Sequence, residues 1–338
     1  MPITNITGID GSRAAYAAGK IINNTKGQQL IITPTFIRAG RLAADLSFFV
    51  NKKIYVMPTD EETFVSYEAK NRDTFLERLR IMKAAAEGED CVIVAPVQVA
   101  IRHLQPSGIF MGGGMHFHLD EKLKLEEVVN RLIDTGYERV PMVYARGQFS
   151  LRGDILDIFT PYGDLPVRIE LFDIQVESLR TFDPDTQRSV EKLEEFEVYP
   201  ASLLIRDPEA FKRAEDLISK NYSGLTERRD RLLDSIDTMT NLQHLENYMN
   251  YFYPDFEYLW DYMDEPTVIF DDPGRIYEGV TARMKEFEED FDTYLERGLV
   301  VRSDRENFAG EDDYFKLYGL DDVYFFSPFS WTLPCCDR

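Results

Sequence analysis

The first third of the chain alternates short apolar runs with segments of helical periodicity. Apolar runs at residues 28–34 (QQLIITP), 52–58 (KKIYVMP) and 91–96 (CVIVAP) predict buried parallel strands. The segments at residues 35–50 and 71–88 repeat apolar residues with the period of a helix. Strands that alternate with helices in this way predict a doubly wound α/β layer.

The pattern changes in the middle of the chain. After one predicted helix at residues 119–136, short strands follow one another closely at residues 143–151, 154–161, 165–172, 176–183 and 193–200. Turn-forming residues such as Pro161, Gly163 and Pro184 separate them. This spacing predicts an antiparallel α+β module.

Helical patterns return after Pro200. Two amphipathic segments at residues 208–222 and 224–252 precede an apolar strand, PTVIFDDP, and a further helix. The α/β layer therefore resumes, and the strand-rich module is an insertion. We predict three parts: residues 1–115 as the first part of the α/β domain, 116–200 as the inserted module, and 201–338 as the second part with its long helices.

Composition narrows the class of protein. The chain has 338 residues, 44% of them hydrophobic, which suffices for two or three packed domains. Its formal net charge of −22 opposes non-specific binding to nucleic acid. With no long apolar run, no secretory signal and three cysteines, the sequence predicts a cytoplasmic protein without a membrane partner.

The segment TGIDGSRAAYAAGKI at residues 7–21 begins like a phosphate-binding loop. Against the helicase pattern G-x-x-G-S-G-K-T, Gly8, Gly11 and Ser12 match. Ala14 stands where the loop needs its Lys, and Ala15 stands where it needs a Thr for Mg²⁺. Because these groups stabilise the charge in phosphoryl transfer, the loop is predicted to be vestigial, without ATPase activity or a bound cofactor.

Two further patterns have weaker chemical implications. The strand VIFDDP ends in Asp271 and Asp272, as an acidic strand that holds Mg²⁺ beside a nucleotide would, but an ordinary strand end fits equally well. Beside the altered loop, it suggests a degenerate RecA/helicase-like layer. His116 and His118 share one strand face in MHFH, but no third ligand lies nearby in the sequence, so no metal site is predicted.

The strand Val167–Phe172 is the most informative segment. Its alternate apolar positions form one face that should pack on the module's helix, so Arg168, Glu170 and Phe172 share the opposite face. An aromatic residue beside an arginine is typical of a protein–protein hot spot, and Arg152 and Arg139 could extend the same surface. A solvated ladder with an incidental Phe is the alternative.

Residues 145–201, ARGQFSLRGDILDIFTPYGDLPVRIELFDIQVESLRTFDPDTQRSVEKLEEFEVYPA, closely resemble the module shared by UvrB and the transcription-repair coupling factors. The long pattern R-G-x-[FIL]-x-x-R-G-x-[IL]-[IVL]-[DE]-[IL]-F is specific, and weaker similarity extends over nearly the whole chain. UvrB has the loop Lys and Thr that Ala14 and Ala15 replace here. It also has a DNA-clamping hairpin after the strand that corresponds to CVIVAP, and the continuation VQVAIRHLQPSGIF leaves no room for it. Both differences favour the N-terminal, UvrB-homologous region of a coupling factor.

The resemblance implies a function and a set of residues. In these families the inserted module recruits UvrA, and the matching positions are Arg152, Arg168, Glu170 and Phe172, with Arg139 as a weaker match. A longer parent would bind RNA polymerase and DNA through downstream domains absent here, and one of them could mask the UvrA surface. The alternative function is a divergent UvrB-type DNA-dependent ATPase or helicase subunit.

Overall fold

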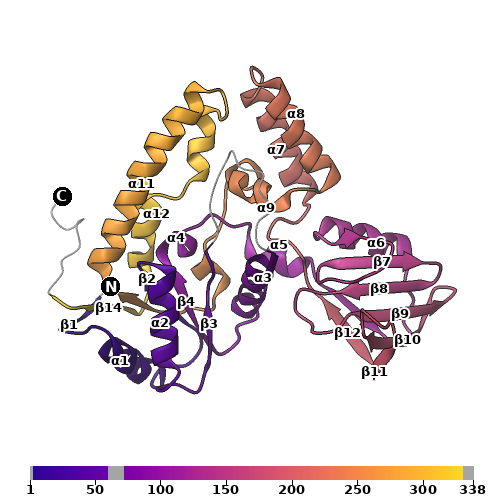
Figure 1. Ribbon diagram of the computed structural model, residues 1–338, viewed down its shortest axis with the longest axis horizontal. Helices are drawn as coiled ribbons and strands as arrows, with labels where there is room; N and C mark the ends of the chain where they lie inside the picture. The colour runs from indigo at the N-terminus through magenta and orange to yellow at the C-terminus, as the bar shows by residue number, and fades with distance from the viewer. Residues whose placement is uncertain (1–2, 60–71, 330–338) are drawn as a thin grey trace. The chain divides into compact units, whose positions relative to one another are not determined.

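The computed structural model describes residues 3–59 and 72–329 (Figure 1). The described residues form two compact units. The first contains residues 3–59, 73–104 and 256–329, and the second contains residue 72 and residues 105–255.

The structure has the following elements. The strands are β1 (Thr4–Thr7), β2 (Gln29–Thr33), β3 (Lys53–Val56), β4 (Cys91–Pro96), β5 (Met115–His118), β6 (Glu138–Arg139), β7 (Gln148–Arg152), β8 (Ile155–Phe159), β9 (Val167–Phe172), β10 (Gln175–Phe182), β11 (Ser189–Leu193), β12 (Glu195–Val198), β13 (Thr267–Asp271) and β14 (Val323–Ser327). The α-helices are α1 (Ser12–Ile22), α2 (Phe36–Leu46), α3 (Arg72–Ala86), α4 (Val97–Ala100), α5 (Ser107–Gly112), α6 (Leu125–Asp134), α7 (Pro208–Asn221), α8 (Thr226–Thr238), α9 (Leu242–Leu245), α10 (Met249–Phe252), α11 (Pro273–Glu296) and α12 (Glu311–Lys316). The 3₁₀ helices are η1 (Glu246–Tyr248), η2 (Leu259–Tyr262), η3 (Arg302–Asn307) and η4 (Leu317–Gly319).

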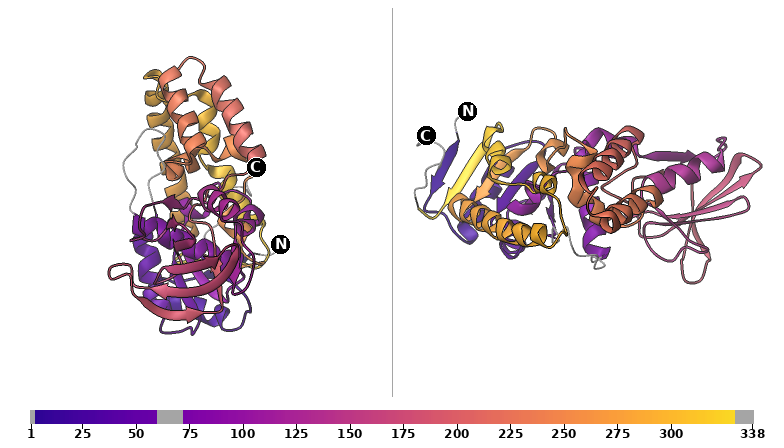
Figure 2. Two further views of the ribbon diagram at one scale, coloured as in Figure 1. Left: turned by 90° about the vertical axis from the view of Figure 1, so that its right-hand side faces the viewer. Right: turned by 90° about the horizontal axis from the view of Figure 1, so that it is seen from above.

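A parallel six-stranded sheet organises the first unit. Its strand order is β1-β14-β13-β2-β4-β3, and β2, β4 and β13 are buried along their whole length. β1 and β14 come from opposite ends of the described chain and lie side by side (Figure 2). Helices α1 and α2 pack their apolar faces on this sheet, which confirms the predicted α/β class with a parallel sheet. The apolar pattern alone predicts neither β1 nor β14.

A second six-stranded sheet organises the inserted module. Its order is β11-β10-β9-β8-β7-β6, with antiparallel pairing from β11 to β7 and a short parallel pairing of β6 with β7. Helix α6 packs on one face and closes the hydrophobic core there. The predicted antiparallel character is confirmed. The strand predicted at residues 193–200 does not join this sheet, because β12 pairs with β5 in a separate ribbon.

The prediction of a single helix over residues 224–252 is wrong. The structure ends α8 at Thr238 and resumes with the short α9, because Met239 and Asn241 adopt left-handed backbone conformations with φ of 53° and 52°. Residues in this conformation cannot continue a right-handed helix. The amphipathic pattern persists across the break, so periodicity alone does not reveal it.

The two compact units divide the chain at residues 104/105 and 255/256, so residues 105–115 lie in the same unit as the module. Residues 201–255, with α7 and α8, belong to the same unit as the module rather than to the α/β layer. The compact units do not mark where the module begins and ends, so its boundaries at residues 116 and 200 stay predictions. Among the described residues, no helix combines the length and the apolar character that a membrane-spanning segment requires.

Candidate partner-binding surface

Strand β9 places its polar and aromatic residues on the sheet face opposite α6. Val167, Ile169 and Leu171 are buried in the core that α6 closes, as the alternation predicted. Arg168 and Glu170 are half-buried on the other face, which is called the outer face below. Phe172, at the end of the strand, is 75% exposed.

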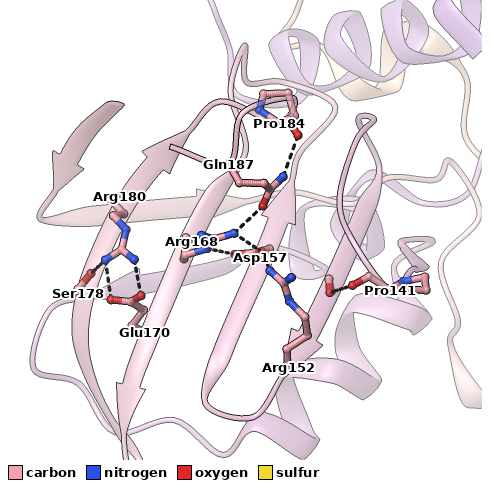
Figure 3. Close-up of polar contacts among 10 residues, drawn as sticks. Pro141, Arg152, Asp157, Arg168, Glu170, Ser178, Arg180, Pro184 and Gln187 are labelled. Atoms are coloured by element: carbon pink, nitrogen blue, oxygen red, sulfur yellow. Dashed lines mark hydrogen bonds and ion pairs between the residues drawn. The ribbon is translucent and has the colours of Figure 1, made fainter. Parts of the chain in front are cut away.

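The outer face centres on a buried carboxylate, Asp157 of β8. Its side chain lies directly opposite Arg168 in the β8–β9 register. Arg168 donates two hydrogen bonds to it, from Nε to Oδ1 at 2.7 Å and from Nη2 to Oδ2 at 2.8 Å (Figure 3). Arg152 of β7 donates from Nη2 to the same Oδ2 at 2.8 Å. The carboxylate is therefore shared by two arginines from neighbouring strands.

Arg168 is largely withdrawn from solvent by these contacts. Its side chain is 13% exposed, its Nη2 also donates to Gln187 Oε1 at 2.9 Å, and its guanidinium lies 4.4 Å from the centre of the Phe182 ring. The hydrogen bonds to Asp157 raise the pKa of Arg168 although burial opposes this. Because a buried carboxylate is costly without a partner, loss of Arg168 would destabilise the sheet.

A second ion pair lies beside the first on the outer face. Arg180 of β10 donates from Nη1 and Nη2 to the two oxygens of the Glu170 carboxylate, and its Nη1 also donates to Ser178 Oγ at 2.9 Å (Figure 3). This bidentate contact lowers the pKa of Glu170 despite its partial burial. The Glu170 side chain is 29% exposed, so a partner can still reach its edge.

The hairpin between β9 and β10 presents two exposed apolar side chains. Phe172 ends β9, Asp173 turns the chain with a φ of 59°, and Ile174 follows with 45% exposure. Sequence patterns singled out Phe172 and missed Ile174. Its apolar character at a two-residue turn, where polar residues are usual, is the signal that could have identified it.

The altered phosphate loop joins β1 to α1 in the first unit. Gly8 and Gly11 have positive φ, as a tight loop requires, and Ser12 begins the helix with its Oγ donating to Asp45 Oδ2 at 3.1 Å. Ala14 and Ala15 are 1% and 0% exposed and pack into the core beneath the loop. At these positions α1 contributes apolar contacts to the core.

The acidic residue that ends β13 forms an ion pair with an arginine. Asp271, 3% exposed, receives two hydrogen bonds from Arg38 of α2, one from Nε to Oδ2 and one from Nη2 to Oδ1 at 2.7 Å. These hydrogen bonds raise the pKa of Arg38. Asp272 instead caps α11 by accepting from the Arg275 amide at 3.3 Å. Arg38, Asp272 and Arg275 line a cavity of about 590 Å³ at this edge of the sheet.

Comparison with known proteins finds a family whose sequence model matches the module. Residues 115–204 match the sequence model of the UvrB interaction domain. The matched residues are called the UvrB interaction domain below, after the family whose sequence model they match. They coincide with β5 to β12 and the helix α6, which include every strand of the outer face.

Relatives extend the match over nearly the whole chain. Transcription-repair-coupling factor of Bacillus subtilis (strain 168) is 29% identical over 90% of this chain and 27% of its own length. The factor of Staphylococcus aureus (strain MRSA252) is 27% identical over 98% of this chain and 29% of its own length. The chain is thus homologous to the N-terminal, UvrB-like region of these factors and spans under a third of their length.

The UvrB interaction domain does not bring all the predicted residues together. Arg139 lies on the edge strand β6 beside Phe149, whose side chain is buried on the α6 face, so the register directs Arg139 away from the outer face. Ser150 on the neighbouring strand β7 is 1% exposed and donates to the Pro141 carbonyl at 2.9 Å. Arg152, Arg168, Glu170 and Phe172 do share the outer face.

The two histidines of the domain lie on β5, opposite glutamates of β12. His116 faces Glu197 at 3.3 Å and His118 faces Glu195 at 3.7 Å. Over residues 3–59 and 72–329, no three metal-binding side chains are grouped closely enough to hold a metal ion.

Proposed function

We propose that this chain is a non-catalytic protein-binding region that recruits the excision-repair protein UvrA during transcription-coupled nucleotide excision repair. The binding surface is the outer face of the UvrB interaction domain, with Arg152, Glu170 and Phe172 in contact with the partner. The family match of residues 115–204 and the named relatives support the assignment to this pathway.

The exposure of Phe172 is the observation on which the proposal mainly depends. A phenyl ring that is 75% exposed at the end of an ordered strand exposes apolar area to water, and a protein partner would remove that cost. Arg152, 42% exposed, lies on the same face and supplies a hydrogen-bonding cation. Aromatic residues and arginines at the centre of an interface are the usual hot spots.

The order of the outer face also favours binding. The Arg180–Glu170 pair and the Arg168–Asp157 pair fix the polar groups around Phe172 before a partner arrives. Side chains held in place in the free protein lose less conformational entropy on binding. A pre-organised face with an exposed aromatic residue therefore supports a docking function more than an incidental surface ladder.

We infer that the first unit is a degenerate RecA/helicase-like layer without ATP hydrolysis. Ala14 and Ala15 lack the amine and hydroxyl that phosphoryl transfer uses, and Arg38 holds the Asp271 carboxylate that would otherwise face Mg²⁺. These features disfavour the alternative function as a UvrB-type DNA-dependent ATPase. DNA-dependent ATP turnover by the purified chain would support that alternative.

A longer parent protein would add further partners. We propose that domains outside this chain bind RNA polymerase and DNA there, and that one of them can cover the outer face. Tighter binding of UvrA by this chain than by the longer parent would support such masking, and equal affinities would exclude it.

Titration of the chain with purified UvrA tests the main proposal. We expect saturable binding that Phe172→Ala weakens strongly. Phe48→Ala is the matched control, because Phe48 is an 84% exposed phenylalanine in the first unit, outside the UvrB interaction domain. Failure of the intact, folded chain to bind UvrA would refute the proposed partner.

A further inference from the structure

We propose that Asp157 is a positioning residue of the outer face. Its buried carboxylate holds the Arg152 guanidinium in the orientation in which the partner binds it, and Arg168 is the buried counter-charge that keeps the carboxylate in place. This inference rests on the proposed function, because it names how one contact residue of that surface is held.

The hydrogen bonds of Asp157 distinguish the two arginines. Arg168 uses Nε and Nη2 to bind both carboxylate oxygens, and Gln187 then accepts from its Nη2. Arg152 makes one bond, from Nη2 to Oδ2. The Nε and Nη2 donors of Arg168 are therefore used within the outer face. Arg152 uses only Nη2 in its bond to Asp157, so its other N–H groups can bind a partner.

The exposed fractions of the three side chains agree with this difference between the two arginines. The Asp157 side chain is 1% exposed, Arg168 is 13% exposed and Arg152 is 42% exposed. Of the three, Arg152 presents the most surface to solvent, and a partner meets it most readily. Asp157 can influence binding only through the groups it holds, because its own oxygens lie beneath them.

The charge balance shows why one carboxylate binds two arginines. One arginine suffices to neutralise Asp157, so the cluster of Asp157, Arg168 and Arg152 retains a net positive charge located at Arg152. A long arginine side chain loses rotamer freedom when a partner immobilises it. A charge that is fixed in the free protein avoids much of that loss while it remains available for an acidic or carbonyl group of the partner.

A double-mutant cycle on the affinity for UvrA tests this role. We expect Arg152→Ala and Asp157→Asn each to weaken binding about tenfold, and the double variant to bind no more weakly than either single variant. A purely structural role of Asp157 would make the two losses add. Additive losses, or an unchanged affinity of folded Asp157→Asn, would overturn the inference.

A second pair of variants tests the inference even if Asp157→Asn alone does not fold. The variant Asp157→Asn/Arg168→Met removes both buried charges together, which is often tolerated when removal of one is not. In that background Arg152→Ala should cause no further loss of affinity. A further loss close to the tenfold effect in the native background would show that Arg152 binds without the help of Asp157, against the inference.

A measurement on the free chain separates this inference from the proposed partner. In ¹⁵N-arginine-labelled protein, the Arg152 guanidinium should give resolved, slowly exchanging Nη signals that average in Asp157→Asn. Arg13, exposed on α1, serves as the reference for an exposed arginine. If Arg152 signals are averaged in the native chain too, the positioning role fails, whether or not UvrA binds.

Discussion

Arg168 and Asp157 face each other across β9 and β8 and are joined by two hydrogen bonds of 2.7 Å and 2.8 Å. The arginine that the sequence pattern points to as a contact residue is thus also a structural member of the sheet. We therefore expect substitutions of Arg168 to affect folding and binding together, and substitutions of Phe172 and Arg152 to report on binding more directly. The predictions below follow from this distinction.

Phe172→Ala should weaken UvrA binding by roughly 2 kcal/mol, which corresponds to about a thirtyfold rise in Kd. The 75% exposed ring contributes little to the core, so the free energy of unfolding should change by under about 0.5 kcal/mol. Calorimetric titration and urea unfolding of the same samples measure both quantities. Equal affinities of Phe172→Ala, Phe48→Ala and the native chain would exclude Phe172 from the interface.

Arg168→Ala should destabilise the domain by about 3 kcal/mol, because it leaves a buried carboxylate with Arg152 as its remaining arginine partner. Arg152→Ala should cost much less, since that side chain is 42% exposed and Arg168 still satisfies both carboxylate oxygens. Urea unfolding followed by circular dichroism compares the two variants. A larger loss for Arg152→Ala than for Arg168→Ala would contradict the assignment of the buried partner.

Arg38→Ala should also destabilise the first unit by about 3 kcal/mol, because Asp271 is 3% exposed and loses its bidentate partner. The double variant Arg38→Met/Asp271→Asn should recover most of this loss, since neither buried charge then remains. Thermal and urea unfolding of the three proteins provide the test.

An assay of ATP turnover tests the altered phosphate loop and Asp271 separately from protein stability. We expect no turnover in Arg38→Ala even though it releases Asp271, because Ala14 and Ala15 still lack the groups that bind phosphate and Mg²⁺. If Arg38→Ala gained DNA-dependent ATPase activity, the loop would not be vestigial.

Asp313 should make the first unit sensitive to acid. Burial alone would raise its pKa, but contacts with His103 and hydrogen bonds from Tyr258 and the Gly310 amide lower the pKa well below the usual range. A carboxyl whose folded pKa is lowered stabilises the protein above its unfolded pKa of about 3.9, and this stabilisation is lost as the pH falls below that value.

Substitution of Asp313 separates its contribution to the acid dependence of stability from that of other carboxylates. Asp313→Asn should lower the free energy of unfolding at pH 6 and flatten its decline from about pH 4 to pH 2.5, as measured by urea unfolding. Asp164→Asn is the control, because that side chain is 98% exposed and should leave the profile unchanged. A native-like decline in Asp313→Asn would assign the acid sensitivity to other carboxylates.

Several features of this protein were predictable from the sequence. Continuous apolar runs predicted β2, β4 and β13, because strands covered on both faces need apolar residues at nearly every position. The strict alternation in Val167–Phe172 predicted which side chains of β9 face the core, because the period of a strand is two. The specific arginine–glycine pattern identified the UvrB interaction domain that the family comparison confirmed.

Other features depended on the tertiary structure. The sequence placed Arg139 with the other arginines, but the parallel pairing of β6 with β7 turned it toward the opposite face. The partners of Asp157 depend on the register of three strands, and Arg38 meets Asp271 across 233 positions of the chain. Periodicity reports the local environment of a side chain, whereas its charged partner is set by strand order and register. For that reason the sequence determined the class of fold and the outer face of β9, and only the folded chain decided which arginine is buried and which remains available to a partner.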